Sequence, residues 1–208
     1  ERLPSTRIRA SPRAEDDPLA SVGISAGADD IVHPTKLGKI ARFPEREVRP
    51  MGRDAAGVIG IRLAAKGDAV MGMSVVKPDA DILVLTETGF GKRVPLTEFR
   101  TKHRGSQGVK LIGLEGRKTG TVAAVELVTE ADEELLLVSS GGQVVRTDIA
   151  SVNRYSSGAR GVIVMRLNGE DTVAGIAVFR AGLAEGRAMG ENGEGDAGTA
   201  DPDAPVAG

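Results

Sequence analysis

The fold is decided by the stretch Gly142-Gln143-Val144-Val145-Arg146 and, downstream of it, Gly161-Val162-Ile163-Val164-Met165-Arg166-Leu167, because two similar pairs of strings precede it. The earlier pairs are Gly38-Lys-Ile-Ala-Arg42 with Gly57-Val-Ile-Gly-Ile-Arg-Leu63, and Gly91-Lys-Arg-Val-Pro95 with Gly108-Val-Lys-Leu-Ile-Gly-Leu114. The second strings start at residues 57, 108 and 161, which gives a repeat period of 51 to 53 residues. A period of this length indicates a propeller, a solenoid or another array of repeated units.

Each unit has the composition of short β-strands joined by tight turns. The runs Ile82-Leu-Val-Leu85 and Leu135-Leu-Leu-Val138 are continuously apolar, as in strands that are covered on both faces. Glycine- and serine-rich turns follow both runs, so each unit is expected to start as a hairpin. No stretch before residue 180 has the pattern of a helix, and the sequence therefore predicts an all-β fold.

The second string of each unit alternates in polarity with a period of two residues. In the first unit Ile59, Ile61 and Leu63 share one side of this alternation, and the other two units are similar. We therefore expect a strand here whose apolar face meets the core.

The repeats define a domain with two flanking segments. We expect a β domain over residues 17–180, with full units at about 31–76, 80–128 and 133–179. Residues 17–24 resemble the segments that close the units, so the chain is expected to begin inside a repeat with one closing strand. Residues 1–16 show no period and are expected to be irregular. Residues 181–208 are rich in Gly, Ala and acidic residues, which predicts a disordered tail.

The charge is distributed unevenly along the chain. Residues 31–180 hold 22 basic and 17 acidic residues, whereas residues 181–208 hold 1 basic and 6 acidic residues. A basic body with an acidic appendage is typical of proteins that bind polyanions. The sequence has no cysteine, no long apolar span and no signal-peptide pattern, so we expect a cytoplasmic protein that does not enter a membrane.

No group of residues has the pattern of a catalytic or metal site. His33 and His103 occupy non-equivalent places in different units, and no cysteine or paired carboxylate accompanies them at ligand spacing. The lone Tyr155 lies in a loop, and serines such as Ser139 and Ser156 lie in Gly/Ser turns without a nucleophile elbow. We therefore expect no catalytic residue, no metal and no cofactor in this chain, and a propeller-type hydrolase is disfavoured.

Basic side chains recur after the hairpin turns and before the Gly-Val strings. If the units repeat in space, these side chains form a stripe along one rim, which suits phosphate backbones. Aromatic residues make up only 2% of the chain, which favours duplex DNA over single strands that stack on aromatic rings. The alternative is a protein-interaction propeller with an acidic partner. The candidate DNA-binding residues are Arg42, Arg49, Arg53, Lys92, Arg93, Lys102, Arg104, Lys110, Arg146, Arg154 and Arg160.

These strings resemble the C-terminal domain of the DNA gyrase A protein, which is part of a bacterial type IIA topoisomerase. The most specific stretch is Arg49-Pro-Met-Gly-Arg-Asp-Ala-Ala-Gly-Val-Ile-Gly-Ile-Arg-Leu63, followed by Gly89-Phe-Gly-Lys-Arg93. The resemblance implies a β-pinwheel, a propeller-like disc of four-stranded blades whose basic perimeter bends and wraps duplex DNA. Here it would be an incomplete disc of about three blades.

The resemblance also implies the setting in which such a domain works. In the holoenzyme, wrapping supports ATP-dependent negative supercoiling. The partners implied are the gyrase B protein, which supplies the ATPase, and the breakage-reunion domain of the gyrase A protein; ATP and Mg²⁺ are used by those other parts. The domain that carries the family's catalytic tyrosine does not resemble any stretch of this sequence, so we expect a fragment that binds DNA without cutting it. The A-type protein of topoisomerase IV, which decatenates DNA, is the alternative within the same class.

Overall fold

The computed structural model describes residues 20–52 and 55–180. The expected irregular segment 1–16, residues 17–19, the expected tail 181–208 and the candidate Arg53 lie outside the described residues. Within the described part the chain forms β-strands and short 3-10 turns and contains no α-helix. The all-β prediction is therefore confirmed.

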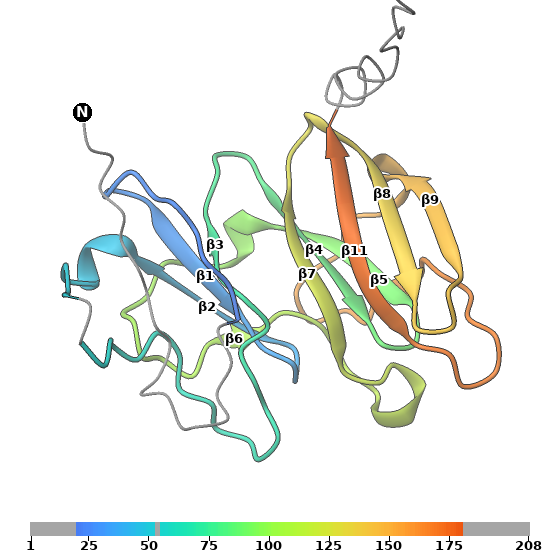
Figure 1. Cartoon of the computed structure of the whole chain (residues 1–208), viewed down its shortest axis with the longest axis horizontal. Coiled ribbons are helices and arrows are strands. Elements are labelled where there is room, and N and C mark those ends of the chain that lie inside the picture. Colours follow the sequence, from blue (N-terminus) through green and yellow to red (C-terminus); the bar gives the residue numbers. More distant parts are fainter. Residues whose placement is uncertain (1–19, 53–54, 181–208) are drawn as a thin grey trace, which may run out of the picture.

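The strands form three antiparallel sheets, which lie side by side in Figure 1. Sheet 1 has the order β3 (Ser74–Val75), β1 (Asp30–Pro34), β2 (Lys39–Pro44) and β6 (Val109–Lys110). Sheet 2 has the order β7 (Val122–Val128), β4 (Asp81–Thr86), β5 (Phe90–Pro95) and β10 (Val162–Ile163). Sheet 3 consists of β11 (Val173–Arg180), β8 (Asp132–Ser139) and β9 (Val144–Asp148).

Four 3-10 turns accompany these strands: η1 (Glu45–Glu47), η2 (Leu96–Glu98), η3 (Gly116–Lys118) and η4 (Ile149–Ser151). Three of them, η1, η2 and η4, directly follow the second hairpin strand of units 1, 2 and 3. Each of these turns therefore occupies the same place in its unit.

The second and third units each give their Gly-Val strand to the sheet before them. Strand β6 comes from the second unit of the sequence but pairs with β2 of sheet 1, and β10 comes from the third unit but pairs with β5 of sheet 2. A blade is therefore built from two consecutive units. This exchange of strands ties neighbouring sheets together through backbone hydrogen bonds.

The Gly-Val strands are shorter than expected. In the first unit Ile61 is buried, but Ile59 and Leu63 are 44% and 42% exposed. Strands β6 and β10 each contain only two residues, after which the chain leaves the sheet edge. The mostly apolar face expected here meets the core only in part. The middle residues Ile61, Ile112 and Met165 are buried, and Leu114 and Leu167 pack against the core, but Ile59, Leu63 and Ile163 are exposed. Residues 20–24, where a closing strand was expected, form no strand, although Ser21 Oγ accepts a hydrogen bond from Met73 N at 2.7 Å.

The hairpin turns correct the alignment of the second unit. Gly38, Gly89 and Gly142 have φ values of +75°, +82° and +85°, a conformation that side chains with a Cβ rarely adopt. The second unit therefore aligns at Gly89 rather than at Gly91. In this alignment Arg42, Arg93 and Arg146 are equivalent residues.

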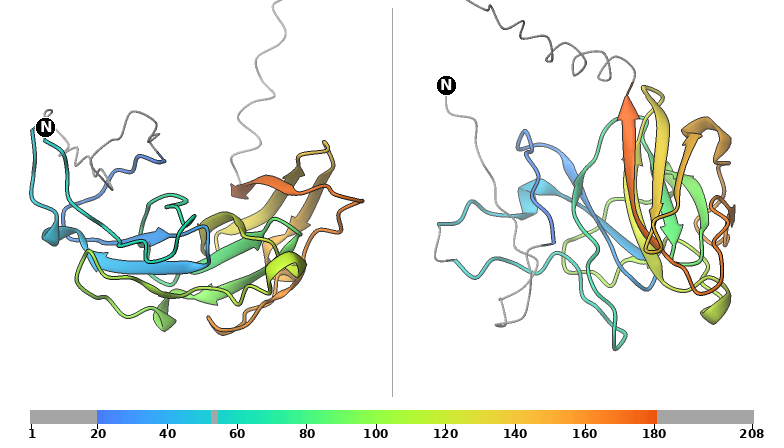
Figure 2. Two further views of the ribbon diagram at one scale, coloured as in Figure 1. Left: turned by 90° about the horizontal axis from the view of Figure 1, so that it is seen from below. Right: turned by 45° about the vertical axis from the view of Figure 1, so that its right-hand side comes forward.

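The core lies between the sheets, which follow an arc (Figure 2). Ile82 and Val84 of β4 pack with Val32 and Ile40 of sheet 1, whereas Leu83 and Leu85 pack with residues of sheet 3 such as Leu135. The continuous apolar run of β4 thus reflects burial on both faces, as predicted. Each such side chain contributes roughly 1.5–3 kcal/mol through burial.

Candidate nucleic-acid interface

Two of the candidate arginines join neighbouring sheets. Arg42 Nε lies 2.8 Å from Asp30 Oδ2, and Arg42 Nη1 donates to the carbonyl oxygens of Leu96 and Phe99 in the next unit at 3.2 and 3.1 Å. Arg93 repeats this arrangement one unit later, with Nη1 3.5 Å from Asp81 Oδ2 and Nε donating to Val152 O at 2.6 Å. These guanidinium groups are bound inside the junctions between sheets.

The carboxylates of these junctions accept a second donor from the next unit. Thr101 Oγ1 donates to Asp30 Oδ2 at 2.6 Å, and Arg154 Nε donates to Asp81 Oδ2 at 2.6 Å. This hydrogen bond and the charge of Asp81 raise the pKa of Arg154. Arg154 therefore belongs to the junction, although half of its side chain is exposed.

Lys92 does not lie on an exposed rim, and this expectation is wrong. Its side chain is completely buried, and Nζ donates to the carbonyl oxygens of Ser156 and Ser157 at 2.6 and 3.0 Å. Burial lowers the pKa of Lys92 to about 8, while Glu98 opposes this shift and Lys110 adds to it. The ammonium group is thus committed to carbonyls of the third unit and is closed to a phosphate.

Arg104 and Arg160 are each held by a carboxylate. The backbone N–H of Arg104 donates to Glu47 Oε2 at 2.8 Å, and this bond, together with His103, lowers the pKa of Glu47. Arg104 Nη1 also donates to Ile59 O at 3.2 Å. Arg160 Nη1 donates to Glu115 Oε2 at 2.6 Å, and Arg160 Cζ lies 4.9 Å from the centroid of the Phe90 ring.

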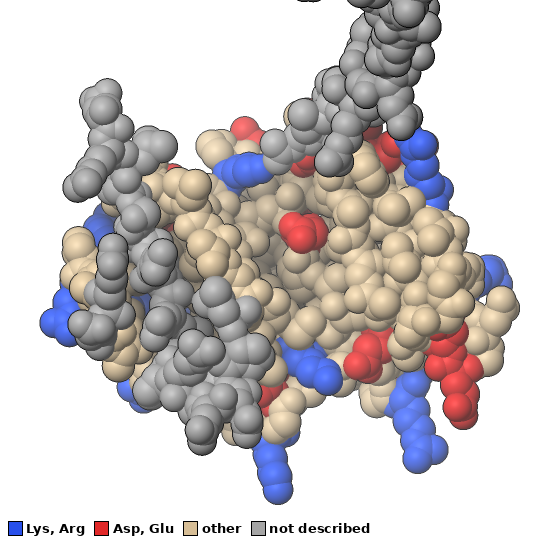
Figure 3. All heavy atoms as spheres, in the orientation of Figure 1, with Lys and Arg blue, Asp and Glu red and all other residues tan. Residues whose placement is uncertain are grey.

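The remaining candidates are more exposed. Arg49, Lys102 and Lys110 lie on the surface, and Arg146 is 67% exposed and ion-paired with Glu134. Figure 3 shows one face of the molecule, where Lys and Arg side chains project mainly around the outline and much of the middle of the face is uncharged.

Five basic residues gather at the edge of sheet 1 that is formed by β6, which we call its outer edge. Lys39 of β2 and Lys110 of β6 are direct cross-strand partners. Lys102 N donates to Arg42 O on β2 at 2.8 Å, and Arg62 N donates to Ser106 O, two residues from Arg104, at 2.9 Å. We call this group the outer-edge cluster: Lys39, Arg62, Lys102, Arg104 and Lys110. Lys39 and Arg62 were not among the candidates predicted from the sequence, although both lie within the repeated strings.

The outer-edge cluster is not repeated on sheet 2. The strand registers, the turn glycines and the equivalent backbone hydrogen bonds align the two units residue by residue. Every basic position of the cluster then corresponds to an uncharged residue on sheet 2. The expectation of a basic stripe with the period of the repeat is therefore wrong, because two of the three arginines that recur after the hairpin turns, Arg42 and Arg93, are bound in the sheet junctions. The sheet 2 residues are Phe90, Gly113, Tyr155, Ser157 and Ile163.

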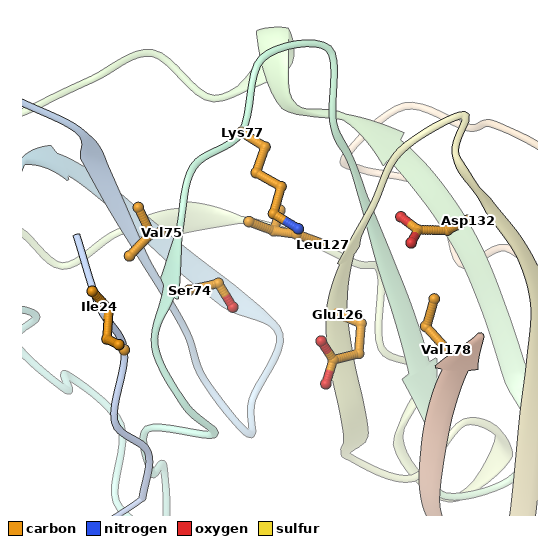
Figure 4. Close-up of a pocket in the computed structure, with 9 residues that line it drawn as sticks. Ile24, Ser74, Val75, Lys77, Glu126, Leu127, Asp132 and Val178 are labelled. Carbon is orange, nitrogen blue, oxygen red and sulfur yellow. The ribbon is translucent and has the colours of Figure 1, made fainter. Parts of the chain in front are cut away.

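An open hollow of about 570 Å³ lies between β3 of sheet 1 and strands β7 and β11 of the other two sheets (Figure 4). Ile24, Ser74 and Val75 line it from the side of sheet 1, and Glu126 and Val178 line it from the other sheets. Burial raises the pKa of Glu126, and the charge of Lys77 opposes this shift.

The described part of the chain holds neither a cluster of metal ligands nor a membrane-spanning helix. No group of three or more His, Asp or Glu side chains in this part of the chain is placed to hold a metal ion. No helix in residues 20–52 and 55–180 has the length and apolar character needed to cross a bilayer.

A row of antiparallel sheets that exchange their outer strands defines a propeller-like repeat domain of the pinwheel type. The chain belongs to the family described as DNA gyrase C-terminal domain, beta-propeller, whose model matches residues 35–77, 80–129 and 133–180. The DNA gyrase A protein of Staphylococcus aureus (strain MRSA252) is 37% identical over 165 residues, which cover 78% of this chain but only 18% of that protein.

Solved structures show the same fold. A DNA gyrase A C-terminal domain superposes with a TM-score of 0.73 at 29% identity, over 80% of this chain and 56% of that chain. The C-terminal domain of a DNA topoisomerase IV superposes with a TM-score of 0.72 at 22% identity, over 77% and 50% of the two chains. The predicted fold and family are thus confirmed.

Proposed function

We propose that this domain binds duplex DNA through the outer-edge cluster and bends it along the arc of sheets, as part of a gyrase A protein. The observation that carries the proposal is the concentration of five basic residues in adjoining segments at one sheet edge, where the Glu47 carboxylate accepts the backbone N–H of Arg104. Basic side chains on one edge neutralise successive phosphates and release counterions, which supplies affinity without base contacts.

The pair Lys39 and Lys110 supports an anionic ligand most directly. Like charges directly opposite each other on neighbouring strands destabilise a sheet. Neither ammonium group has a carboxylate partner among the described ion pairs. A phosphate placed between the two side chains would remove their repulsion, so bound DNA stabilises an arrangement that is unfavourable without it.

In this proposal, DNA cleavage and supercoiling are activities of a larger protein of which the chain is one part. The chain spans about a fifth of the length of the gyrase A relatives that it matches. We propose that its parent carries the breakage-reunion chemistry in another domain and works with the gyrase B protein, where ATP and Mg²⁺ are used for negative supercoiling at the bacterial nucleoid. A gyrase setting is favoured over topoisomerase IV because the 37% identical relative is a gyrase protein, whereas the 22% identical topoisomerase IV structure supports only the fold.

Closure of nicked plasmid by ligase in the presence of the chain tests the proposal. DNA bent around the domain traps a handed change in linking number, which fades as salt weakens the phosphate contacts. The double variant Lys39→Gln/Lys110→Gln should lose most of this change. The matched control Lys77→Gln/Arg117→Gln removes two exposed charges outside the outer-edge cluster and should keep it.

Two results would contradict the proposal. Duplex binding without a handed change in linking number would show that the domain binds DNA but does not bend it as proposed. An equal loss in the control double variant would show that total charge, rather than the outer-edge cluster, determines binding.

A further inference from the structure

A histidine lies between two residues of the outer-edge cluster. His103 follows Lys102 and precedes Arg104 in the loop before β6, and its side chain is 96% exposed. Its Nδ1 atom lies 2.8 Å from Glu47 Oε1, on η1 of the first unit. Because nearly the whole imidazole is exposed, an anionic ligand bound at the cluster can reach it.

The loop that carries His103 is fixed on both sides of this residue. Lys102 N donates to Arg42 O at 2.8 Å, and Arg104 N donates to Glu47 Oε2 at 2.8 Å. Both bonds join the loop of the second unit to sheet 1 or to the turn that follows β2. The imidazole therefore has a defined place beside the basic side chains of the cluster.

The histidine is not needed to anchor this loop. In the next unit Glu98 Oε2 accepts the backbone N–H of Ser157 at 2.8 Å, which is the same bond one repeat later. Ser156 takes the place of His103 in that loop. Since the bond recurs without a histidine, anchoring does not account for the imidazole on sheet 1.

The contact with Glu47 decides which ring nitrogen of His103 carries a hydrogen. The backbone N–H of Arg104 and the bond to His103 lower the pKa of Glu47, so its carboxylate is ionised near neutral pH. An ionised carboxylate can only accept, and Nδ1 must donate to it. In the neutral imidazole Nε2 is then an acceptor, whereas in the charged form Nε2 is a donor as well. A phosphate oxygen can therefore accept a hydrogen bond from Nε2 only when His103 is protonated.

We propose that His103 is a further phosphate contact of the outer-edge cluster, made when the imidazole is protonated and lost when it is neutral. This inference rests on the proposed binding of duplex DNA. Among the described residues, Glu47 of η1 contacts the imidazole from another element, and Lys102 and Arg104 flank it on its own loop. A phosphate at Nε2 adds negative charge and favours the protonated form, so binding takes up a proton and tightens as the pH falls.

DNA titrations of the whole chain at two pH values test the inference. Histidine changes its charge between about pH 5 and 8, so labelled duplex DNA is titrated at about pH 6 and pH 8 over a range of salt concentrations. The slope of log K against log salt should be steeper by about 1 at the lower pH, because one more phosphate is neutralised. The affinity should rise by up to about fivefold, as for an exposed ion pair.

Two substitutions of the same residue imitate its two states. His103→Gln stays neutral and should give the shallow slope at both pH values, whereas His103→Lys stays charged and should give the steep slope at both. Urea unfolding should show the same midpoint for both variants and the unchanged chain, because the side chain is exposed. His33 is retained in both variants, so any pH dependence left in them comes from other groups.

The matched control is Ala131→Lys, which adds one charge at an exposed position in the turn between β7 and β8. It should keep the slopes of the unchanged chain at each pH. A pH-dependent slope that persists in His103→Gln would overturn the inference, and so would equal slopes for the Gln and Lys variants at pH 8. DNA binding with one slope at both pH values would overturn this inference alone. Absence of DNA binding at both pH values would overturn the proposed function with it.

Discussion

His33 is a buried imidazole in a position where the other units have aliphatic side chains. It is 2% exposed, stacks on Phe43 with the ring centroids 5.4 Å apart, and neither of its ring nitrogens has a hydrogen-bond partner among the described residues. The equivalent residues are Val84 and Leu137. A Cβ on Gly60 would lie only 3.0 Å from His33 Nε2, so the small glycine provides the room for the ring.

This burial predicts a pH-dependent stability. Desolvation lowers the pKa of His33 from 6.5 to about 4. The unfolded chain therefore takes up a proton first as the pH falls, and stability is lost between pH 6.5 and 4, by up to about 3 kcal/mol. Urea unfolding of the chain and of His33→Leu at about pH 7 and pH 5, on either side of the ordinary histidine pKa, measures this loss, which should be smaller in the variant. Parallel pH profiles would contradict the prediction.

Lys92 and Lys110 are expected to separate stability from DNA binding. Lys92→Ala removes a buried ammonium group that holds two carbonyl oxygens and leaves a cavity, which should cost roughly 2–4 kcal/mol of unfolding free energy. Lys110→Ala changes an exposed side chain and should not lower the urea midpoint, because it only removes the repulsion between Lys110 and Lys39. Its effect should instead appear in DNA titrations, where the slope of log K against log salt becomes shallower by about 1. A stable Lys92→Ala variant with weakened DNA binding would reverse these assignments.

At the scale of the element, the junction arginines offer a comparison within one chain. Arg93 and Arg146 occupy the same hairpin position, but Arg93 is 18% exposed and reaches the next unit, whereas Arg146 contacts only its own sheet among the described residues. Arg93→Ala leaves the 6% exposed Asp81 without one of its two cationic partners. This should lower the unfolding free energy by roughly 2–4 kcal/mol.

Arg146→Ala is the matched control for that substitution. Its side chain is exposed to solvent, so thermal or urea unfolding of the chain should show no measurable change. An equal loss of stability in both variants would mean that the bonds to the next unit do not matter. The prediction therefore tests the junction itself rather than the ion pair within one hairpin.

The hairpin strands were predictable from sequence, but the pairing between units was not. Apolar runs such as 82–85 and the turn glycines are local signals, and they indicated the hairpins correctly. Strand exchange depends on contacts between residues about 70 positions apart, such as Gly91 with Val162, which no local pattern encodes. The same limit applies to the candidate DNA-binding residues. Arg93 and Lys110 are both basic residues within repeated strings, and only the contacts of Arg93 in the sheet junction show that it is bound within the protein.

At the scale of the whole molecule, the basic surface is uneven along the arc. The outer-edge cluster lies on sheet 1, and its counterpart on sheet 2 is formed by residues such as Phe90, Tyr155 and Ile163. The repeat period in the sequence suggested an even distribution of charge, since it reflects the shared backbone plan. The side chains at equivalent positions differ, so we expect DNA to be held most firmly at sheet 1.

This asymmetry can be reversed by substitution. Phe90 and Ile163 are cross-strand partners at the positions of Lys39 and Lys110, so Phe90→Lys/Ile163→Lys should extend the cationic edge to sheet 2. If DNA follows the outer edges, two added phosphate contacts should steepen the slope of log K against log salt by about 2. They should also increase the linking-number change trapped per bound chain, because the duplex is held over a longer arc. The control Val22→Lys/Ile24→Lys adds the same charge at exposed positions away from these edges. Equal steepening by both double variants would show that the duplex does not follow the edges of the sheets.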